Sequence, residues 1–321
     1  MSDAFPAPRP PRSPHAHPPV DTDRVADTQL TLLMRLLPAP ARPYALLARF
    51  DRPIGWWLLY WPCAWALALA GSLADAWPLL LWFLLGAIAM RGAGCVYNDI
   101  LDRDLDRQVA RTAQRPVASG AVSLKAAWVW LLALCLIGLV VLLQLPAGAQ
   151  LIALASLAPV AAYPLMKRIS WWPQAWLGLV FSWGALVGWA AVAGGRWLVG
   201  LALYAGTIAW VIGYDTIYAI QDIEDDALVG IRSSARRLGA RVRGGVAIFY
   251  AVALALWAWA IWQVRADWLA LVTLLPAALH LAWQANGVDP ADGAGALARF
   301  RSNRTTGFLL FMAFLVIGAS V

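Results

Sequence analysis

The chain has 321 residues, of which 61% are hydrophobic and 13% are charged. Ordinary soluble proteins carry about 25% charged residues, so the composition excludes that class and indicates an integral membrane protein. A net charge of +7 would suggest nucleic acid binding in a soluble protein, but here the distribution of charge along the chain is informative instead, and we expect no nucleic-acid partner.

The first 45 residues differ in composition from the remainder. Seven prolines lie between residues 6 and 19, and a segment of this composition cannot bury an apolar core. We therefore expect a disordered, Pro-rich cytoplasmic tail over residues 1–45 and one transmembrane domain over residues 46–321. Leucines that alternate with Arg35, Arg42 and Arg49 predict a short interfacial helix within residues 30–50.

Apolar runs long enough to cross a bilayer recur from residue 54 onward. A helix of about 20 residues spans a hydrocarbon core of roughly 30 Å, and continuous apolar runs exclude the alternating pattern of a membrane β-barrel. We predict an all-α protein with nine transmembrane helices. The expected spans are 54–74, 78–97, 126–145, 149–166, 175–194, 197–218, 243–264, 267–285 and 306–320.

Basic residues mark one side of the predicted bundle. They follow spans two, four and six and precede span nine, whereas the alternate connections hold only Arg196 and Arg265. By the positive-inside rule, the amino terminus and the basic loops are cytoplasmic and the carboxyl terminus is outside. An odd number of spans gives the same orientation, and we expect a multi-pass protein of the cell inner membrane.

Two acidic clusters follow predicted spans on the cytoplasmic side. Residues 97–106 and 214–226 together contain half of the chain's 18 acidic residues. A carboxylate at the bilayer centre costs roughly 2.5–3.5 kcal/mol, so acids at a membrane edge need a compensating partner. On continuous helices, each cluster would present three acids on one face. These acids are Asp99, Asp102 and Asp106 in the first cluster and Asp215, Asp222 and Asp226 in the second.

The chemistry of these clusters favours a divalent cation. Two carboxylates about 4 Å apart repel by on the order of 4 kcal/mol at an effective dielectric constant near 20. Oxygen ligands without His or Cys select a hard ion, and Mg²⁺ prefers one or two carboxylates together with phosphate oxygens. A solvated loop with ordinary capping acids is the alternative, but two similar stripes on one side disfavour it. We predict Asn98, Asp99, Asp102, Asp106, Asp215, Asp222 and Asp226 as metal ligands, and Arg111, Arg115, Lys167 and Arg232 as diphosphate ligands.

The motifs around these clusters resemble those of a known family. Asn98-Asp99-x-x-Asp102-x-x-x-Asp106 and Asp222-x-x-x-Asp226 are similar to the two signatures of the UbiA-type intramembrane prenyltransferases. Further segments resemble members of that family that act on 4-hydroxybenzoate, and the resemblance covers roughly residues 46–320. These segments are Asp51-Arg52-Pro53-Ile54-Gly55, Arg91-Gly92-Ala93-Gly94-Cys95, 111–121, Tyr163-Pro164-Leu165-Met166-Lys167-Arg168 and 214–219.

The resemblance implies a fold and an activity. The expected fold is a nine-helix bundle around a central, lipid-open cavity, capped on the cytoplasmic side by the loops 99–125 and 219–242, which follow helices two and six. The expected enzyme uses Mg²⁺ to transfer a polyprenyl group from polyprenyl diphosphate to the ring carbon ortho to the hydroxyl of 4-hydroxybenzoate, a membrane step of ubiquinone biosynthesis. No obligate protein partner is implied.

The resemblance also implies roles for particular residues. Asp99, Asp102, Asp222 and Asp226 would be catalytic, and Arg49, Arg91, Arg168, Tyr163 and Tyr218 would bind the aromatic substrate. Two alternatives remain open. A sister enzyme would use the same metal apparatus with homogentisate, a naphthoate or haem as acceptor, whereas a cation transporter would place acids near the midplane or on both sides of the membrane.

Overall fold

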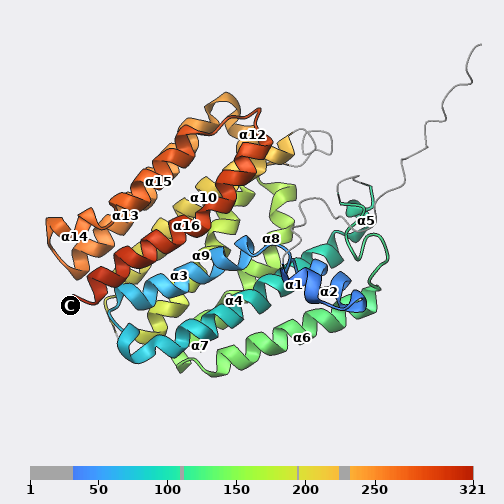
Figure 1. The fold of residues 1–321 in the computed structure, drawn as a ribbon, viewed down its shortest axis with the longest axis horizontal. Helices are drawn as coiled ribbons and strands as arrows, with labels where there is room; N and C mark the ends of the chain where they lie inside the picture. The colour runs from blue at the N-terminus through green and yellow to red at the C-terminus, as the bar shows by residue number, and fades with distance from the viewer. Residues whose placement is uncertain (1–31, 109–111, 194, 224–231, 321) are drawn as a thin grey trace, which may run out of the picture.

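The computed structural model (Figure 1) describes residues 32–108, 112–193, 195–223 and 232–320, and within these ranges every regular element is helical. Most of the expected disordered tail lies outside the described residues. From residue 32 onward the chain forms α1 (Leu32–Leu36), a 3₁₀ turn (Ala39–Ala41) and α2 (Arg42–Leu47), and the division into a disordered tail and one transmembrane domain stays a prediction. These short helices coincide with the interfacial helix expected within residues 30–50.

The nine expected spans all lie within or along helices. Three of them are interrupted by residues outside the helices: the first at residues 70–72, the fourth at Ser156 and the eighth at residues 273–274. The main helices are α3 (Ile54–Leu69), α4 (Leu73–Leu101), α6 (Leu124–Leu143), α7 (Ala147–Ala155), α8 (Leu157–Ile169), α9 (Pro173–Val192), α10 (Trp197–Tyr218), α13 (Val242–Val264), α14 (Trp268–Val272), α15 (Leu275–Asn286) and α16 (Gly293–Gly318).

Six helical stretches of the described chain are long and apolar enough to cross a membrane, which makes this an integral membrane protein. They contain α4, α6, α9, α10, α13 and the α14–α15 pair. The other three expected spans are not both long enough and apolar enough, so nine crossings stay a prediction. Helix α3 has 16 residues, which gives a length of about 24 Å at 1.5 Å per residue. Ser156 divides the fourth expected span into the shorter helices α7 and α8. Helix α16 is long but carries three arginines.

Close approach of helix backbones holds the bundle together. Helix α3 packs between α9 and α16, and α10 packs against α9 and α13. Small residues stand at these crossings, as is usual between membrane helices. A Cβ atom on Gly188 of α9 would lie 2.8 Å from the Cys63 carbonyl oxygen, and one on Gly307 of α16 would lie 2.1 Å from the Trp61 ring. Large residues at these two positions would therefore separate α3 from its neighbours.

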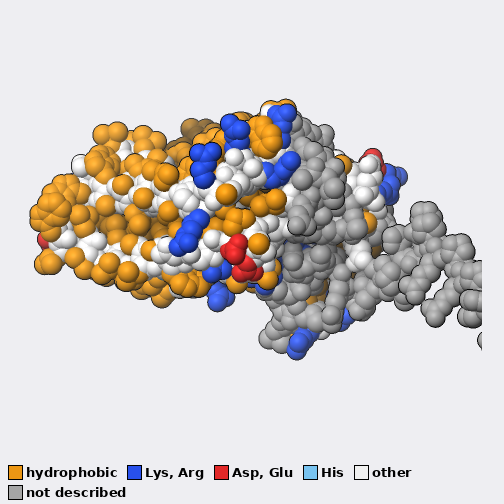
Figure 2. All heavy atoms as spheres, turned by 90° about the horizontal axis from the view of Figure 1, so that it is seen from above, with side chains coloured by type: hydrophobic (Ala, Val, Ile, Leu, Met, Phe, Trp, Pro, Cys, Tyr) orange, Lys and Arg blue, Asp and Glu red, His pale blue; other side chains and the backbone are white. Residues whose placement is uncertain are grey.

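Charged and apolar side chains occupy different ends of the molecule. In Figure 1, the short helices α5 (Arg103–Asp106) and α12 (Ser234–Leu238) lie toward one end, and α14 and the carboxyl terminus lie at the other. Figure 2 shows hydrophobic side chains over the end that carries α14, whereas arginine and lysine side chains gather toward the opposite half. The acidic clusters at the ends of α4 and α10 therefore lie at the polar end of the bundle. The cytoplasmic cap stays a prediction, because residues 224–231 are outside the described chain.

Candidate active site

The first acidic cluster lies where α4 passes into α5. Helix α4 ends at Leu101, but the backbone N–H groups of Asp102 and Asp106 donate to the carbonyl oxygens four residues earlier, at 2.9 and 2.8 Å, and so keep the helical direction. Asp99 and Asp106 are therefore buried on one side, with exposed fractions of 2% and 6%. The Asp104 side chain is 80% exposed. This division is the one that helical spacing predicts.

The second cluster departs from the predicted helical stripe. Helix α10 ends at Tyr218 and a 3₁₀ turn follows over Ala219–Asp222. A 3₁₀ turn advances about 120° per residue instead of about 100°, so the α-helical spacing from Asp215 no longer holds at Asp222. Both side chains nevertheless line the same cavity. Asp226 lies outside the described residues.

One cavity of about 810 Å³ joins the two clusters. It lies among side chains of α3, α4, α8, α9, α10 and α16. Asp102 is buried, but it does not line this cavity. Eleven predicted site residues line the cavity: Arg49, Arg91, Asn98, Asp99, Asp106, Arg115, Tyr163, Asp215, Tyr218, Asp222 and Arg232.

Three further predicted residues have no described side chain. Arg111 lies outside the described residues. Lys167 and Arg168 belong to α8 by their backbone, but their side chains are not described. Their predicted contacts with the diphosphate and the aromatic substrate therefore stay predictions.

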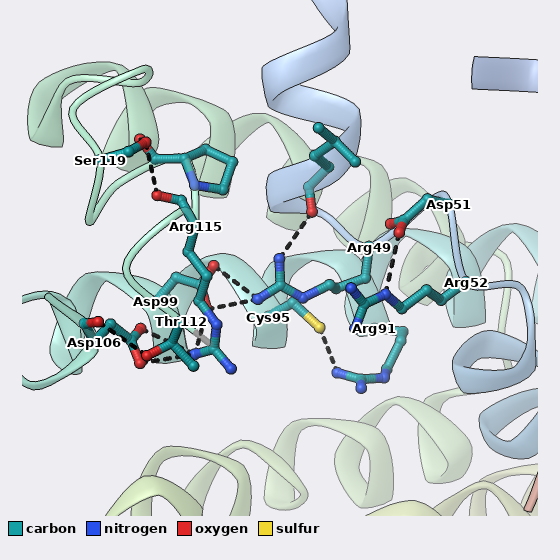
Figure 3. A network of polar contacts seen from close by, with 12 residues as sticks. Arg49, Asp51, Arg52, Arg91, Cys95, Asp99, Asp106, Thr112, Arg115 and Ser119 are labelled. Atoms are coloured by element: carbon teal, nitrogen blue, oxygen red, sulfur yellow. Dashed lines mark hydrogen bonds and ion pairs between the residues drawn. The ribbon is translucent and has the colours of Figure 1, made fainter. Parts of the chain in front are cut away.

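Two arginines hold the acids of the first cluster (Figure 3). Arg49 Nη2 donates to both carboxylate oxygens of Asp99 at 3.0 Å, and its Nη1 donates to the Leu46 carbonyl oxygen. Arg115 Nη1 lies 2.9 Å from an oxygen of Asp106 and 3.3 Å from an oxygen of Asp99. Burial raises the pKa of Asp106, and Arg115 opposes part of that rise. Ion pairs of this kind offset the cost of burying the carboxylates.

Arg49 thus pairs with the first acidic cluster, and its contact with the aromatic substrate stays a prediction. Its backbone is left-handed, with φ of 57°, a conformation that costs a non-glycine residue on the order of 1 kcal/mol or more. Burial is the largest single influence and would lower the pKa of Arg49, but the neighbouring groups Asp99, Cys95, Asp51 and Asp106 together raise the pKa above its usual value. Sequence spacing could not indicate a pair whose members are 50 residues apart.

Arg91 lies deeper in the cavity, within α4. Its Nη1 donates to the Cys95 sulfur at 2.5 Å, and its guanidinium lies 5.5 Å from the centre of the Phe181 ring. The buried Nε atom has no hydrogen-bond partner among the described residues. A Cβ atom on Gly55 would lie 2.8 Å from this Nε, so the glycine leaves the room that Arg91 occupies. The arginine retains donor capacity toward an anion in the cavity.

Helix α16 supplies a wall of the cavity that the sequence analysis missed. Leu297, Phe300, Arg301 and Arg304 all line it. Their spacing of i, i+3, i+4 and i+7 is the signal of a single helix face, but the arginines had been interpreted only as markers of topology. Phe300 packs on Tyr218, with ring centres 4.6 Å apart, and so adds an aromatic surface to the wall.

Besides the Cys95 sulfur, which accepts a hydrogen bond from Arg91, the described part of the cavity offers oxygen donors suited to a hard cation. Asn98 and the carboxylates of Asp99, Asp106, Asp215 and Asp222 line it. One nitrogen of Arg115 contacts both Asp99 and Asp106, so these two carboxylates are within reach of a single small group. In the described part of the chain, no three acidic, His or Cys side chains are already gathered as a metal site. The donor chemistry fits Mg²⁺.

The apolar helices, together with acids and arginines around one cavity, define a polytopic membrane protein with a charged internal cavity. Comparison with known sequences identifies which one: the chain belongs to the UbiA prenyltransferase family, whose pattern matches residues 59–316.

Curated relatives are similar over most of the chain. A mitochondrial 4-hydroxybenzoate polyprenyltransferase of Arabidopsis thaliana is 40% identical over 303 residues, which cover 93% of this chain and 74% of the relative. Seven further relatives with the same name are 42–44% identical. The chain spans 63–78% of the length of these eight proteins.

Solved structures share the fold. The apo structure of a UbiA homolog from Aeropyrum pernix K1 is 27% identical, with a TM-score of 0.66 over 81% of this chain and 97% of that one. A UbiA homolog from Archaeoglobus fulgidus bound to GPP and Mg²⁺ is 17% identical, with a TM-score of 0.65 over 87% of this chain and 100% of that one.

Proposed function

We propose that this protein transfers a polyprenyl group from polyprenyl diphosphate to the carbon ortho to the hydroxyl of 4-hydroxybenzoate, a membrane step of ubiquinone biosynthesis. The observation that carries the proposal is the convergence of both acidic clusters and several arginines on one cavity. Curated relatives at 40–44% identity bear the name of this activity. In this proposal the substrates are a lipid diphosphate and a small aromatic acid.

The acidic residues would hold Mg²⁺ against the donor's diphosphate. The ligands are drawn from Asn98, Asp99, Asp102, Asp106, Asp215, Asp222 and Asp226, and Asp99, Asp102, Asp222 and Asp226 are the catalytic members of this set. Bound Mg²⁺ supplies Lewis-acid stabilisation of the departing diphosphate. The UbiA homolog of Archaeoglobus fulgidus, which shares the fold, was solved with GPP and Mg²⁺.

Basic and aromatic side chains would complete the catalytic work. Arg111, Arg115, Lys167 and Arg232 would contact diphosphate oxygens that do not bind the metal. Loss of diphosphate leaves an allylic cation, which the faces of Tyr163 and Tyr218 would stabilise while the apolar walls exclude water. The acceptor ring then attacks through the carbon ortho to its hydroxyl, and that carbon loses a proton.

The acceptor would enter with its carboxylate toward an arginine. Arg91 is suited to this role, because no described residue accepts a hydrogen bond from its buried Nε and its guanidinium lies beside an aromatic ring in the cavity. Arg168 is a second candidate for binding the acceptor carboxylate, and it is supported by the sequence alone. Arg49 is engaged with Asp99, which favours a role on the diphosphate side of the cavity.

The proposal extends to the placement of the protein in the membrane. We expect nine crossings of the cell inner membrane, with the amino terminus and a cap formed by loops 99–125 and 219–242 on the cytoplasmic side and the carboxyl terminus outside. The distribution of arginines supports this orientation. Charged side chains gather at the end of the molecule where that cap would lie.

The test is the incorporation of ring-labelled 4-hydroxybenzoate into a lipid-extractable product by purified protein with one long-chain donor. Product should form with Mg²⁺ and not with a chelator, and Asp222→Ala should abolish it while the protein still inserts. Parallel reactions with homogentisate, a naphthoate and haem identify a sister activity. Faster formation of prenylated product from one of these acceptors than from 4-hydroxybenzoate would overturn the assignment of 4-hydroxybenzoate.

A further inference from the structure

Arg49 and Arg115 compete with a cation for the oxygens of the first acidic cluster. Arg49 occupies both oxygens of Asp99 at 3.0 Å. Arg115 contacts Asp106 through both of its oxygens, at 2.9 and 3.1 Å, and reaches Asp99 as well. Asp99 is 2% exposed and Asp106 is 6% exposed, so water screens these charges weakly. A divalent cation that approaches the same oxygens meets two guanidinium charges at close range.

The charge of the whole cavity wall points in the same direction. Among the described residues that line it are seven arginines and four aspartates. A bare divalent cation adds positive charge to a wall that is already net positive. A diphosphate supplies negative charge and accepts hydrogen bonds from guanidinium groups, often two from one arginine. The same arginines that oppose a lone cation therefore favour a cation that arrives with a diphosphate.

We infer that this site binds its divalent cation weakly alone and tightly together with a diphosphate, because Arg49 and Arg115 exchange their contacts with Asp99 and Asp106 for contacts with the diphosphate. This inference deepens the proposed function and rests on it. It makes the two arginines positioning residues that couple the two ligands. By thermodynamic linkage, each ligand raises the affinity for the other by the same factor.

The test measures binding without any transfer reaction. Purified protein in detergent is dialysed to equilibrium against Mn²⁺, with and without inorganic pyrophosphate, and protein-bound Mn²⁺ is counted at matched free Mn²⁺. The wild type should bind Mn²⁺ about tenfold more tightly when pyrophosphate is present, within the usual range of about 5–150-fold for coupled ligands. Equal binding with and without pyrophosphate would overturn the inference.

Charge removal gives a second, more specific outcome. Arg115→Gln should bind Mn²⁺ alone several-fold more tightly than the wild type and should lose most of the gain from pyrophosphate. Arg49→Gln should change in the same direction. A purely structural role predicts weaker binding of Mn²⁺ alone in both variants, and that result would also overturn the inference. Arg241→Gln is the matched control, because Arg241 is exposed and is not part of the cavity wall.

Arg115→Lys guards against loss of folding in the glutamine variants. The lysine keeps the positive charge beside Asp106, so Mn²⁺ alone should still bind weakly. Tight binding of Mn²⁺ alone by Arg115→Lys would contradict competition by charge. No acceptor is present in these measurements, so failure of the 4-hydroxybenzoate assay with intact coupling would reject only the acceptor, whereas absent coupling in an active enzyme would reject only this inference.

Discussion

Replacement of Arg91 by glutamine tests the acceptor side of the cavity. The Arg91 guanidinium lies 5.5 Å from the Phe181 ring centre, and its buried Nε has no hydrogen-bond partner in the described part of the chain. A carboxylate that binds here would accept charge-assisted hydrogen bonds. Arg91→Gln removes the charge but keeps an amide donor. We expect it to weaken acceptor binding and leave the affinity for the polyprenyl donor unchanged.

The expected magnitude follows from the type of contact. A hydrogen bond to a charged group contributes about 1.5–3 kcal/mol, and each 1.4 kcal/mol is a factor of ten in affinity. The KM for 4-hydroxybenzoate should therefore rise about 10–100-fold. A larger loss is not expected, because glutamine can still donate one hydrogen bond to the acceptor carboxylate.

The assay compares two acceptors in a cycle. Purified wild type and Arg91→Gln are each offered 4-hydroxybenzoate and its uncharged amide, with one polyprenyl donor held in excess. The variant should lose turnover of the acid and change turnover of the amide by less than about threefold. Arg196→Gln, at an exposed arginine that is not part of the cavity wall, should match the wild type for both. Equal losses for acid and amide would refute the contact between Arg91 and the carboxylate.

Three further predictions concern the metal, the acidic stripe and the packing. Removal of divalent cations by a chelator should reduce labelled product to background and added Mg²⁺ should restore it; persistent turnover would contradict the role of the metal. Asp99→Asn should lower kcat by about 100-fold or more, which corresponds to roughly 2.7 kcal/mol of activation barrier. Asp104→Asn, at a side chain that is 80% exposed, should keep kcat within twofold of the wild type. Similar losses in both variants would contradict the distinction between buried and exposed acids in the first cluster. Gly307→Ala should destabilise the protein by about 1–3 kcal/mol and lower its melting temperature, because the added Cβ would lie 2.1 Å from the Trp61 ring. Gly148→Ala is the control: no atom lies within 4 Å of its Cβ, so it should leave the melting temperature unchanged.

The separation of buried from exposed acids was predictable because it depends on local geometry. Helical spacing alone distinguishes Asp99 and Asp106 from Asp104, and burial in the structure follows that spacing. The stripe in the second cluster failed at Tyr218, where the α-helix gives way to a 3₁₀ turn. In a 3₁₀ turn the backbone hydrogen bonds join residues three apart instead of four. The residue types around Tyr218 do not indicate this change.

The amino-acid sequence by itself determined that this is a helical membrane protein, because the length and apolarity of its runs leave no other way to satisfy the backbone in a bilayer. It also determined that acids gather on one side of the bundle. Only the tertiary structure decided which arginine meets which acid. The contacts of Arg49 and Arg115 with Asp99 span 50 and 16 residues, and Gly55 makes room for Arg91 from another helix. Such pairs depend on how closely helices pack, a property of both surfaces together rather than of either segment.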